Sequence, residues 1–335
     1  MEKQLVLRNA AIGAAAALVL SACAGVQKDP DPTPISPTAV LEVHLASSGL
    51  QDAPAFESTT VTYTRANMMR SESKGHGTGA ITRFLDMESG ARIERLDRKL
   101  AWTLDARNKL AEQCPLTGCP VPALKKTPGK IPTATDKSRN PDCRLRSGNT
   151  SVTIEPTGQK RNINGFEAEQ YDVKWVSTFR DNASRRSTST IALDVWATPG
   201  TTDLRDAMAL EKAFARARDK LTDTDTESDR SAFFPVEAGK VIGAYLAPNV
   251  SPTDRAAFLA GARKLEKIKG QPVLVTLQWR FSGEACGMNE AAATEATKDA
   301  DDRPLLTFTS EVKMHRTEAR HDSLFVPPKD YKITK

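Results

Sequence analysis

The five cysteines are the residues of this 335-residue sequence best suited to covalent chemistry. Once Cys23 is assigned to the N-terminal motif described below, four remain for pairing: Cys114, Cys119, Cys143 and Cys286. An even number in an exported chain favours disulfides, with three possible connectivities. Three of the four flank the segment 115–149, which disulfides would staple. A zinc site is the alternative, but the paired C-x2-C spacing is missing, and the spacing of Cys114 and Cys119 does not favour a redox motif.

The familiar catalytic motifs are absent or incomplete. The tetrapeptide at 71–74 matches S-x-x-K, but it lies in a predicted polar strand and lacks the S-D-N and K-T-G companions. The glycine-rich stretch at 75–79 lacks the features of a phosphate loop, and we expect it to form a hairpin tip. The four histidines form no H-E-x-x-H motif; they are His44, His76, His315 and His321. We therefore expect a protein that is not an enzyme and has no cofactor.

Charged residues give no strong signal for a metal or a nucleic acid. The acidic run 223–229 begins like a calcium loop, but Ser228 and Phe234 occupy the positions of its glycine and its bidentate glutamate, so we predict a solvated linker and no metal site. The net charge is only +5. Basic pairs such as 125–126 and 185–186 are scattered without aromatic residues between them, which argues against nucleic acid. Anionic lipid headgroups are a better candidate than nucleic acid for a negatively charged partner.

The N-terminus has the pattern of an export signal. Two basic residues lie in the first nine, residues 10–20 are an apolar stretch, and 15 of the first 22 residues are apolar. Leu20, Ser21, Ala22 and Cys23 then resemble the lipobox of bacterial lipoproteins. This resemblance implies cleavage before Cys23, a diacylglycerol on its thiol and a membrane anchor. The residue after the cysteine is Ala24 and not aspartate, which resembles the lipoproteins that are sent to the outer membrane. The alternative is an ordinary secretory signal.

The sequence predicts three segments: a signal peptide over 1–22, an acylated cysteine with a proline-rich stalk over 23–38, and a single domain over 39–335. Prolines at this density favour an extended chain. The body contains no second run of the ~20 apolar residues that a membrane-spanning helix needs, which excludes a multi-span membrane protein.

Alternation of apolar and polar residues dominates the body and predicts half-buried strands. Leu41, Val43 and Leu45 share one face of the first strand, and Val61 and Tyr63 alternate in the same way. Further strands are expected over 67–74, 79–87, 91–97, 101–105, 109–114, 150–155, 166–179, 188–197, 272–282, 305–317 and 323–326. Short turns between many of them, such as 88–90, predict a largely antiparallel sheet. Segments 115–149 and 283–303 are expected to be irregular.

Helices are expected in one insertion near 202–269. Apolar spacing predicts a helix over 202–220 and a shorter one near 237–246. The third, over 251–269, has the clearest signals: Ser251 as cap, Pro252 in the first turn, Asp254 three residues after the cap and Gly270 at the end.

Ordered motifs along the body resemble a family of uncharacterised bacterial envelope proteins. They include I-E-R-L-D at 93–97, W-T-L-D at 102–105 and P-L at 115–116. The likeness continues in order at 163–171, 195–197, 270–273, 311–312, 323–327 and Tyr331. That family looks like the incomplete β-barrel of the Lol-type lipoprotein carrier and its outer-membrane receptor. The resemblance implies an α+β fold in which a strongly curved antiparallel sheet is covered by two or three helices, with a concave face that accepts acyl chains. The cysteines, the 115–149 insertion and the longer helical block depart from the carrier pattern.

The expected function follows from the anchor and this concave face. Its candidate residues are Leu41, Val43, Leu45, Val61, Tyr63, Ile191, Leu193, Val195, Val273, Val275 and Leu277. We expect a non-enzymatic lipoprotein, anchored in the outer membrane and facing the periplasm, that binds a lipid or another lipoprotein's acyl chains. The alternative is a structural or partner-binding lipoprotein whose concave face is filled by core. The sequence identifies no protein partner.

Overall fold

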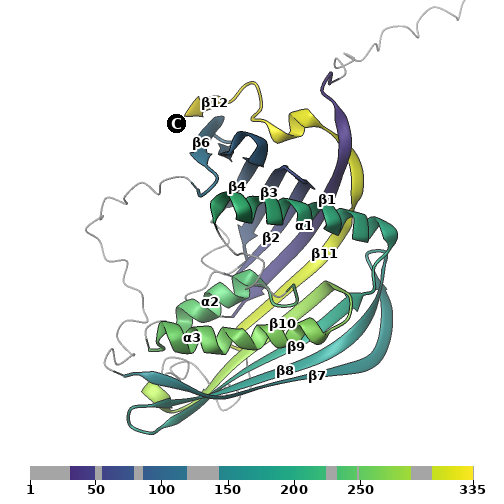
Figure 1. The fold of residues 1–335 in the computed structure, drawn as a ribbon. Helices are drawn as coiled ribbons and strands as arrows, with labels where there is room; N and C mark the ends of the chain where they lie inside the picture. Colours follow the sequence, from purple (N-terminus) through teal and green to yellow (C-terminus); the bar gives the residue numbers. More distant parts are fainter. Residues whose placement is uncertain are drawn as a thin grey trace, which may run out of the picture.

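One large β-sheet with three α-helices makes up the described part of the chain (Figure 1). The computed structural model describes residues 31–49, 55–78, 86–118, 143–223, 232–246, 249–287 and 304–334. The strands are β1 (Ile35–Ser48), β2 (Phe56–Arg65), β3 (Met68–Gly77), β4 (Asp86–Arg95), β5 (Leu100–Asp105), β6 (Leu110–Pro115), β7 (Leu145–Ile163), β8 (Phe166–Asp181), β9 (Arg186–Thr198), β10 (Gln271–Gly283), β11 (Leu306–His321) and β12 (Lys332–Thr334).

The strand order is β12-β6-β5-β4-β3-β2-β1-β11-β10-β9-β8-β7. All of these pairs are antiparallel except β12 with β6. Strands β1–β6 form one meander and β7–β10 another. Strand β11 joins the two by pairing with β1 and β10. The sheet is open, with β12 and β7 at its edges. The predicted α+β class with a largely antiparallel sheet is confirmed.

The longest hairpin, β7–β8, closes through Asn164 and Gly165. Both have positive φ, 51° and 91°. Two consecutive residues with φ > 0 define the turn whose twist matches that of antiparallel strands, and Asn-Gly is its preferred sequence. The turn therefore sets the register that pairs Ile163 with Phe166.

The three helices lie on the same side of the sheet (Figure 1). They are α1 (Thr202–Thr222), α2 (Val236–Leu246) and α3 (Pro252–Leu259), and a 3-10 helix, η4 (Ala260–Lys267), continues α3. The side chain of Ser251 accepts a hydrogen bond from the Asp254 amide, as the capping pattern predicts. Within the described residues, none of the helices combines the length and the apolar character that a membrane crossing requires. We call the side of the sheet that carries the helices the helix face and the other side the outer face.

The largest core lies on the helix face, between β7–β10 and the helices α2, α3 and η4. Trp175 and Trp279 are fully buried there, together with Phe258 of α3 and Ile242 of α2. The Trp175 ring stacks on Phe258 at 5.0 Å between centroids. This half of the helix face is therefore filled by side chains.

The outer face of β2–β6 is covered by the C-terminal segment. Phe325, in the 3-10 helix η7 (Asp322–Phe325), is fully buried against Ile93 and Trp102. Guanidinium groups from three neighbouring strands donate to backbone carbonyls around this helix: Arg65 to Arg320 (2.6 Å), Arg70 to Leu324 (3.0 Å) and Arg95 to Phe325 (3.5 Å). The strand predicted over 323–326 is thus a 3-10 helix, fixed by side-chain donors rather than by a sheet ladder.

Several predicted boundaries were wrong. Strand β1 begins at Ile35, inside the predicted stalk, and Thr38 is fully buried, where it accepts a hydrogen bond from Arg65. The turn expected at 88–90 lies within β4, and residues 75–77 of the expected hairpin tip belong to β3. Strand β7 extends from 145 to 163 instead of 150 to 155. In each case pairing with a neighbouring strand extends the element through residues that favour turns or loops locally.

Candidate functional site

A groove separates α1 from the sheet on the half of the helix face that α2 and α3 do not fill. It has a volume of about 810 Å3 and lies between α1, residues 232–236 and the strands β1, β10 and β11. Its apolar lining residues are Leu41, Val43, Met208, Ala209, Ala215, Ala232, Phe234, Pro235, Val236, Pro272, Leu274, Val275 and Val312. Ligand sites in proteins typically enclose roughly 300–1,000 Å3 and are mainly apolar.

The floor of the groove follows from the pairing of β1, β11 and β10. Val43 is paired with Val312, and Ser310 of β11 is paired with both Leu45 and Val275. Residues opposite one another on neighbouring strands share a face. The alternation predicted for the first strand therefore continues across three strands that are distant in the sequence.

A bulge in β11 adds His315 to this floor. The register changes between Glu42 and Val43, so that Leu41 is paired with His315 while Val43 is paired with Val312. Residues three apart on a regular strand point to opposite faces, but an extra residue in one strand restores them to the same face. His315 and Val312 accordingly both line the groove.

Helix α1 provides the opposite wall and carries most of the charge. Arg205, Met208, Lys212 and Ala215 lie three or four residues apart, the spacing of one helix face, and all line the groove. Glu211, from the same wall, contacts His315 at 3.1 Å between Oε1 and Nε2. This contact joins α1 to the floor across the groove.

The far end of α1 is fixed by a buried carboxylate. Glu94 of β4 is 3% exposed and accepts hydrogen bonds from Arg218 of α1 (2.9 Å) and Arg92 (2.7 Å). Phe214 packs beside it against Leu96 and Leu116. Helix α1 is therefore attached firmly at this end and spans the groove toward its other end.

The groove does not hold a complete nucleophile–base–acid arrangement among the described residues. His315 and Glu211 form a histidine–carboxylate pair, and Ser310 lines the same groove. No hydrogen bond joins Ser310 to His315 in the described part of the chain, whereas an activated serine lies within hydrogen-bond reach of its base. The pair can instead orient or recognise a polar group of a ligand.

The structure divides the predicted concave face into four groups. Leu41 and Val43 line the groove, and Val275 lines it while also packing into the neighbouring core. Leu45, Ile191, Leu193, Val195 and Leu277 pack into the core beneath α2 and α3. Val273 packs with Trp196 and Leu204 beside a bulge in β10.

Val61 and Tyr63 were placed on the wrong face. They are paired with Glu42 and Val40, whereas Leu41 is paired with Thr62. Both therefore point to the outer face, where Tyr63 packs against the cluster around Phe325. Alternation within a strand shows which residues share a face but not which face that is.

Several lining residues were missed by the sequence analysis, among them Met208, Glu211, Phe234, Val312 and His315. Val312 alternates with Phe308 and Ser310, so periodicity could have identified it. The wall residues required the position of α1, which the sequence pattern does not contain.

The three cysteines in the described part of the chain are disulfide-bonded. Cys143 and Cys286 are bonded to each other at 2.02 Å, across 143 positions of sequence. Cys114 is also disulfide-bonded, while Cys119 and Cys23 lie outside the described residues. Sulfurs that are bonded to one another are not the thiolates that a four-cysteine zinc site requires.

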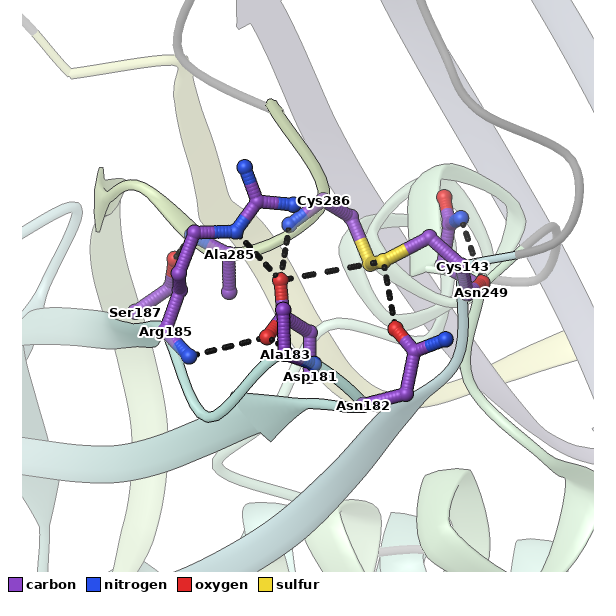
Figure 2. The surroundings of a disulfide bond; sticks show 9 residues. All are labelled: Cys143, Asp181, Asn182, Ala183, Arg185, Ser187, Asn249, Ala285 and Cys286. Atoms are coloured by element: carbon purple, nitrogen blue, oxygen red, sulfur yellow. Dashed lines mark hydrogen bonds and ion pairs between the residues drawn. A yellow bond between two sulfur atoms is a disulfide. The ribbon is translucent and has the colours of Figure 1, made fainter.

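Beside the Cys143–Cys286 bond lies a buried carboxylate, Asp181 (Figure 2). One oxygen, Oδ1, accepts hydrogen bonds from the Ala183 amide (2.9 Å) and the Arg185 amide (2.8 Å). The other, Oδ2, accepts from the Cys286 amide (3.0 Å) and from the Arg185 guanidinium (2.8 Å). Burial acts to raise the pKa of Asp181, but these donors together outweigh it and hold the pKa below its ordinary value.

Asp181→Asn should lower the free energy of unfolding at neutral pH and reduce the further loss of stability on acidification. The amide would place a donor toward the Cys286 and Arg185 donors, at a cost of about 1–3 kcal/mol in the free energy of unfolding. Because the folded-state pKa of Asp181 is lowered, its contribution is present above the unfolded-state pKa of about 4 and is lost as pH falls toward the folded-state value. Urea unfolding at pH 7 and pH 3 measures both effects. A variant that loses as much stability on acidification as the parent chain would contradict this role.

The N-terminal motif, Leu20, Ser21, Ala22 and Cys23, lies outside the described residues. Comparisons of the chain with protein-family models, curated proteins and solved structures find no match.

Proposed function

We propose that this protein is a non-enzymatic envelope lipoprotein that binds a lipid or acyl chain in the groove between α1 and the sheet. Anchoring through Cys23 in the outer membrane, with the body facing the periplasm, is supported by the sequence pattern at 20–23. In this proposal the open sheet curves around the helices as an incomplete β-barrel, and α1 covers the ligand.

The observation that carries the proposal is the difference between the two halves of the helix face. Beneath α2 and α3, Leu193 and Leu277 are at most 2% exposed, and aromatic side chains fill the space. Beneath α1, Leu41 and Val43 belong to the same face but are only half-buried along the groove. Apolar residues that face a groove in this way can gain burial when a ligand covers them.

The distribution of polar groups favours an amphiphilic ligand. The floor is mainly apolar, whereas the α1 wall contributes Arg205, Glu211 and Lys212. An acyl chain lying along Val43 and Val275 would place its polar end toward that wall. Few polar groups in a mainly apolar site are typical of pockets that orient a ligand.

Val43→Trp should block this site, because the indole would project from the floor into the groove. The binding assay should use the Cys23→Ser chain, because this change removes the cysteine that is proposed to carry the protein's own acyl chains. We expect binding of a fluorescent fatty acid to weaken at least about tenfold, a loss of roughly 1.4 kcal/mol. Co-purified lipid, detected by native mass spectrometry, should also disappear.

Val61→Trp is the matched control. Val61 lies on the neighbouring strand, where it is paired with Glu42, and both side chains face the outer side. This variant should therefore bind the fatty acid as the parent chain does. Binding that is absent from the Cys23→Ser chain, or equal in Val43→Trp and Val61→Trp, would overturn the proposal.

A structural or partner-binding lipoprotein is the second candidate, favoured by the packed core beneath α2 and α3. If the groove binds no lipid, cross-linking in the cell envelope should give one dominant protein partner. Cross-linking that yields no such partner would contradict this candidate.

A further inference from the structure

Three arginines form a row on the outer face, across β7, β8 and β9. Arg146 is paired with Arg180, and Arg180 is paired with Arg186. Side chains at directly opposite positions of antiparallel strands share a face and lie about 5 Å apart at Cβ. Phe179, next to Arg180 in sequence, is buried in the core on the helix face, so the row points away from the helices and from the groove beneath α1.

None of these three guanidinium groups has a hydrogen bond or ion pair among the described residues. Asp181, next to Arg180 in sequence, is bound by Arg185. Glu284 donates its backbone amide to the Arg186 carbonyl, but no ion pair joins these two side chains in the described part of the chain. Like charges directly opposite one another destabilise a sheet. We therefore expect the row to lower the stability of the fold, with no compensating ion pair from the described residues.

A hollow of about 910 Å3 lies over this row. Besides the row, a fourth arginine, Arg144, lines it together with hydroxyl and amide side chains, from Ser147, Asn149, Thr178, Asn182 and Ser184. The side chain of the one acidic lining residue, Asp181, is fully buried and holds the hydrogen bonds described above. The hollow thus offers several donors and a concentration of positive charge.

We propose that this hollow binds a phosphate-bearing anion. Guanidinium groups match phosphate oxygens with paired, charge-assisted hydrogen bonds, and three of them would be neutralised by a group of charge near −2 more completely than by one carboxylate. The ligand would be either a phospholipid headgroup at a membrane surface or a soluble phosphate compound. This site lies on the opposite face of the sheet from the groove and does not depend on the function proposed for it.

The test compares Arg180→Gln, at the centre of the row, with Lys174→Gln. Both residues are exposed on β8, six positions apart and therefore on the same face, and both variants lose one positive charge. The Cys23→Ser chain is used throughout. Calorimetry with inorganic pyrophosphate measures soluble binding, and co-sedimentation with phosphatidylglycerol vesicles, against phosphatidylcholine vesicles, measures headgroup binding.

Arg180→Gln should weaken binding about tenfold or more, because it removes the central charge-assisted donor. Lys174→Gln should change it little. In phosphate-free buffer, Arg180→Gln should also raise the melting temperature by roughly 1–3 °C, since it relieves repulsion on both sides.

The two arms identify the source of the phosphate. Pyrophosphate binding that Arg180→Gln weakens about tenfold or more supports a soluble ligand, and vesicle binding with the same dependence supports a headgroup. No binding in either arm, or equal losses in the two variants, would overturn the proposal. A lower melting temperature of Arg180→Gln without ligand would also overturn it, because the row would then be a structural element.

Discussion

Replacing Cys143 and Cys286 together by alanine should lower the free energy of unfolding by roughly 2–5 kcal/mol. The bond joins residues 143 positions apart, and closing a loop of that length removes much of the conformational freedom of the unfolded chain. It also links the beginning of β7, an edge strand, to the chain just after β10. Guanidinium unfolding under oxidising conditions measures the loss.

The effect should be greatest locally at the β7 edge. Cys143 precedes β7, and its carbonyl accepts a hydrogen bond from the Asn249 side chain at 3.0 Å. Cys286 donates its amide to Asp181. Hydrogen exchange in the double variant should therefore be faster at the ends of β7 and β8, while exchange in β1–β3 changes little. Neither of the hydrogen-bond partners just named lies in β1–β3. Unchanged unfolding midpoints, or uniform acceleration over the sheet, would contradict this account.

The strands could be predicted from local pattern, but their order could not. Alternation in 272–282 and 305–317 locates β10 and β11 closely. Nothing in these segments shows that β11 pairs with β1, which begins 271 positions before it in the chain. The order depends on contacts between distant residues, and propensity does not contain those contacts.

The faces of the strands show the same limit. Val61 alternates as clearly as Val43, yet it faces the outer side, because β2 is paired so that Thr60 lies opposite Val43. The bulge that places His315 beside Leu41 is likewise a property of the pair β1–β11. A shift of one residue moves every side chain to the other face, so the groove could be predicted only in part.

The arginine row illustrates what pairing adds. In the sequence, Arg146, Arg180 and Arg186 are separated members of a mildly basic chain, and they suggest no site. The register of β7, β8 and β9 places them opposite one another. A charge cluster formed by distant residues becomes visible only when the ladder is known.

The second large effect is expected at Trp175, the centre of the packed half of the helix face. Trp175→Ala should lower the free energy of unfolding by about 3–5 kcal/mol, the usual cost of removing a large buried ring. Trp175 is fully buried and stacks on Phe258 of α3, and its ring centroid lies 5.5 Å from that of Phe234. Its Nε1 donates a hydrogen bond to Oγ of Ser177 at 3.2 Å. Guanidinium unfolding measures the loss.

The absence of a side chain at Gly261 permits this packing. Substitution at Gly261 therefore tests whether the Trp175 ring holds η4 against the sheet. A Cβ at Gly261 would lie 2.5 Å from Cζ2 of Trp175, so Gly261→Ala should cost about 1–3 kcal/mol by overpacking. In the Trp175→Ala background that ring is gone, and Gly261→Ala should then cost little.

The double variant should accordingly be more stable than the sum of the two single losses predicts, with a coupling of about 1–3 kcal/mol between the sites. Gly243→Ala is the control, because nothing lies within 4 Å of its added Cβ in α2. It should leave stability unchanged or raise it by up to about 1 kcal/mol through helix propensity. Additive losses at positions 175 and 261 would mean that α3 and η4 are not held against the sheet through this ring, and the filled half of the helix face would need another explanation.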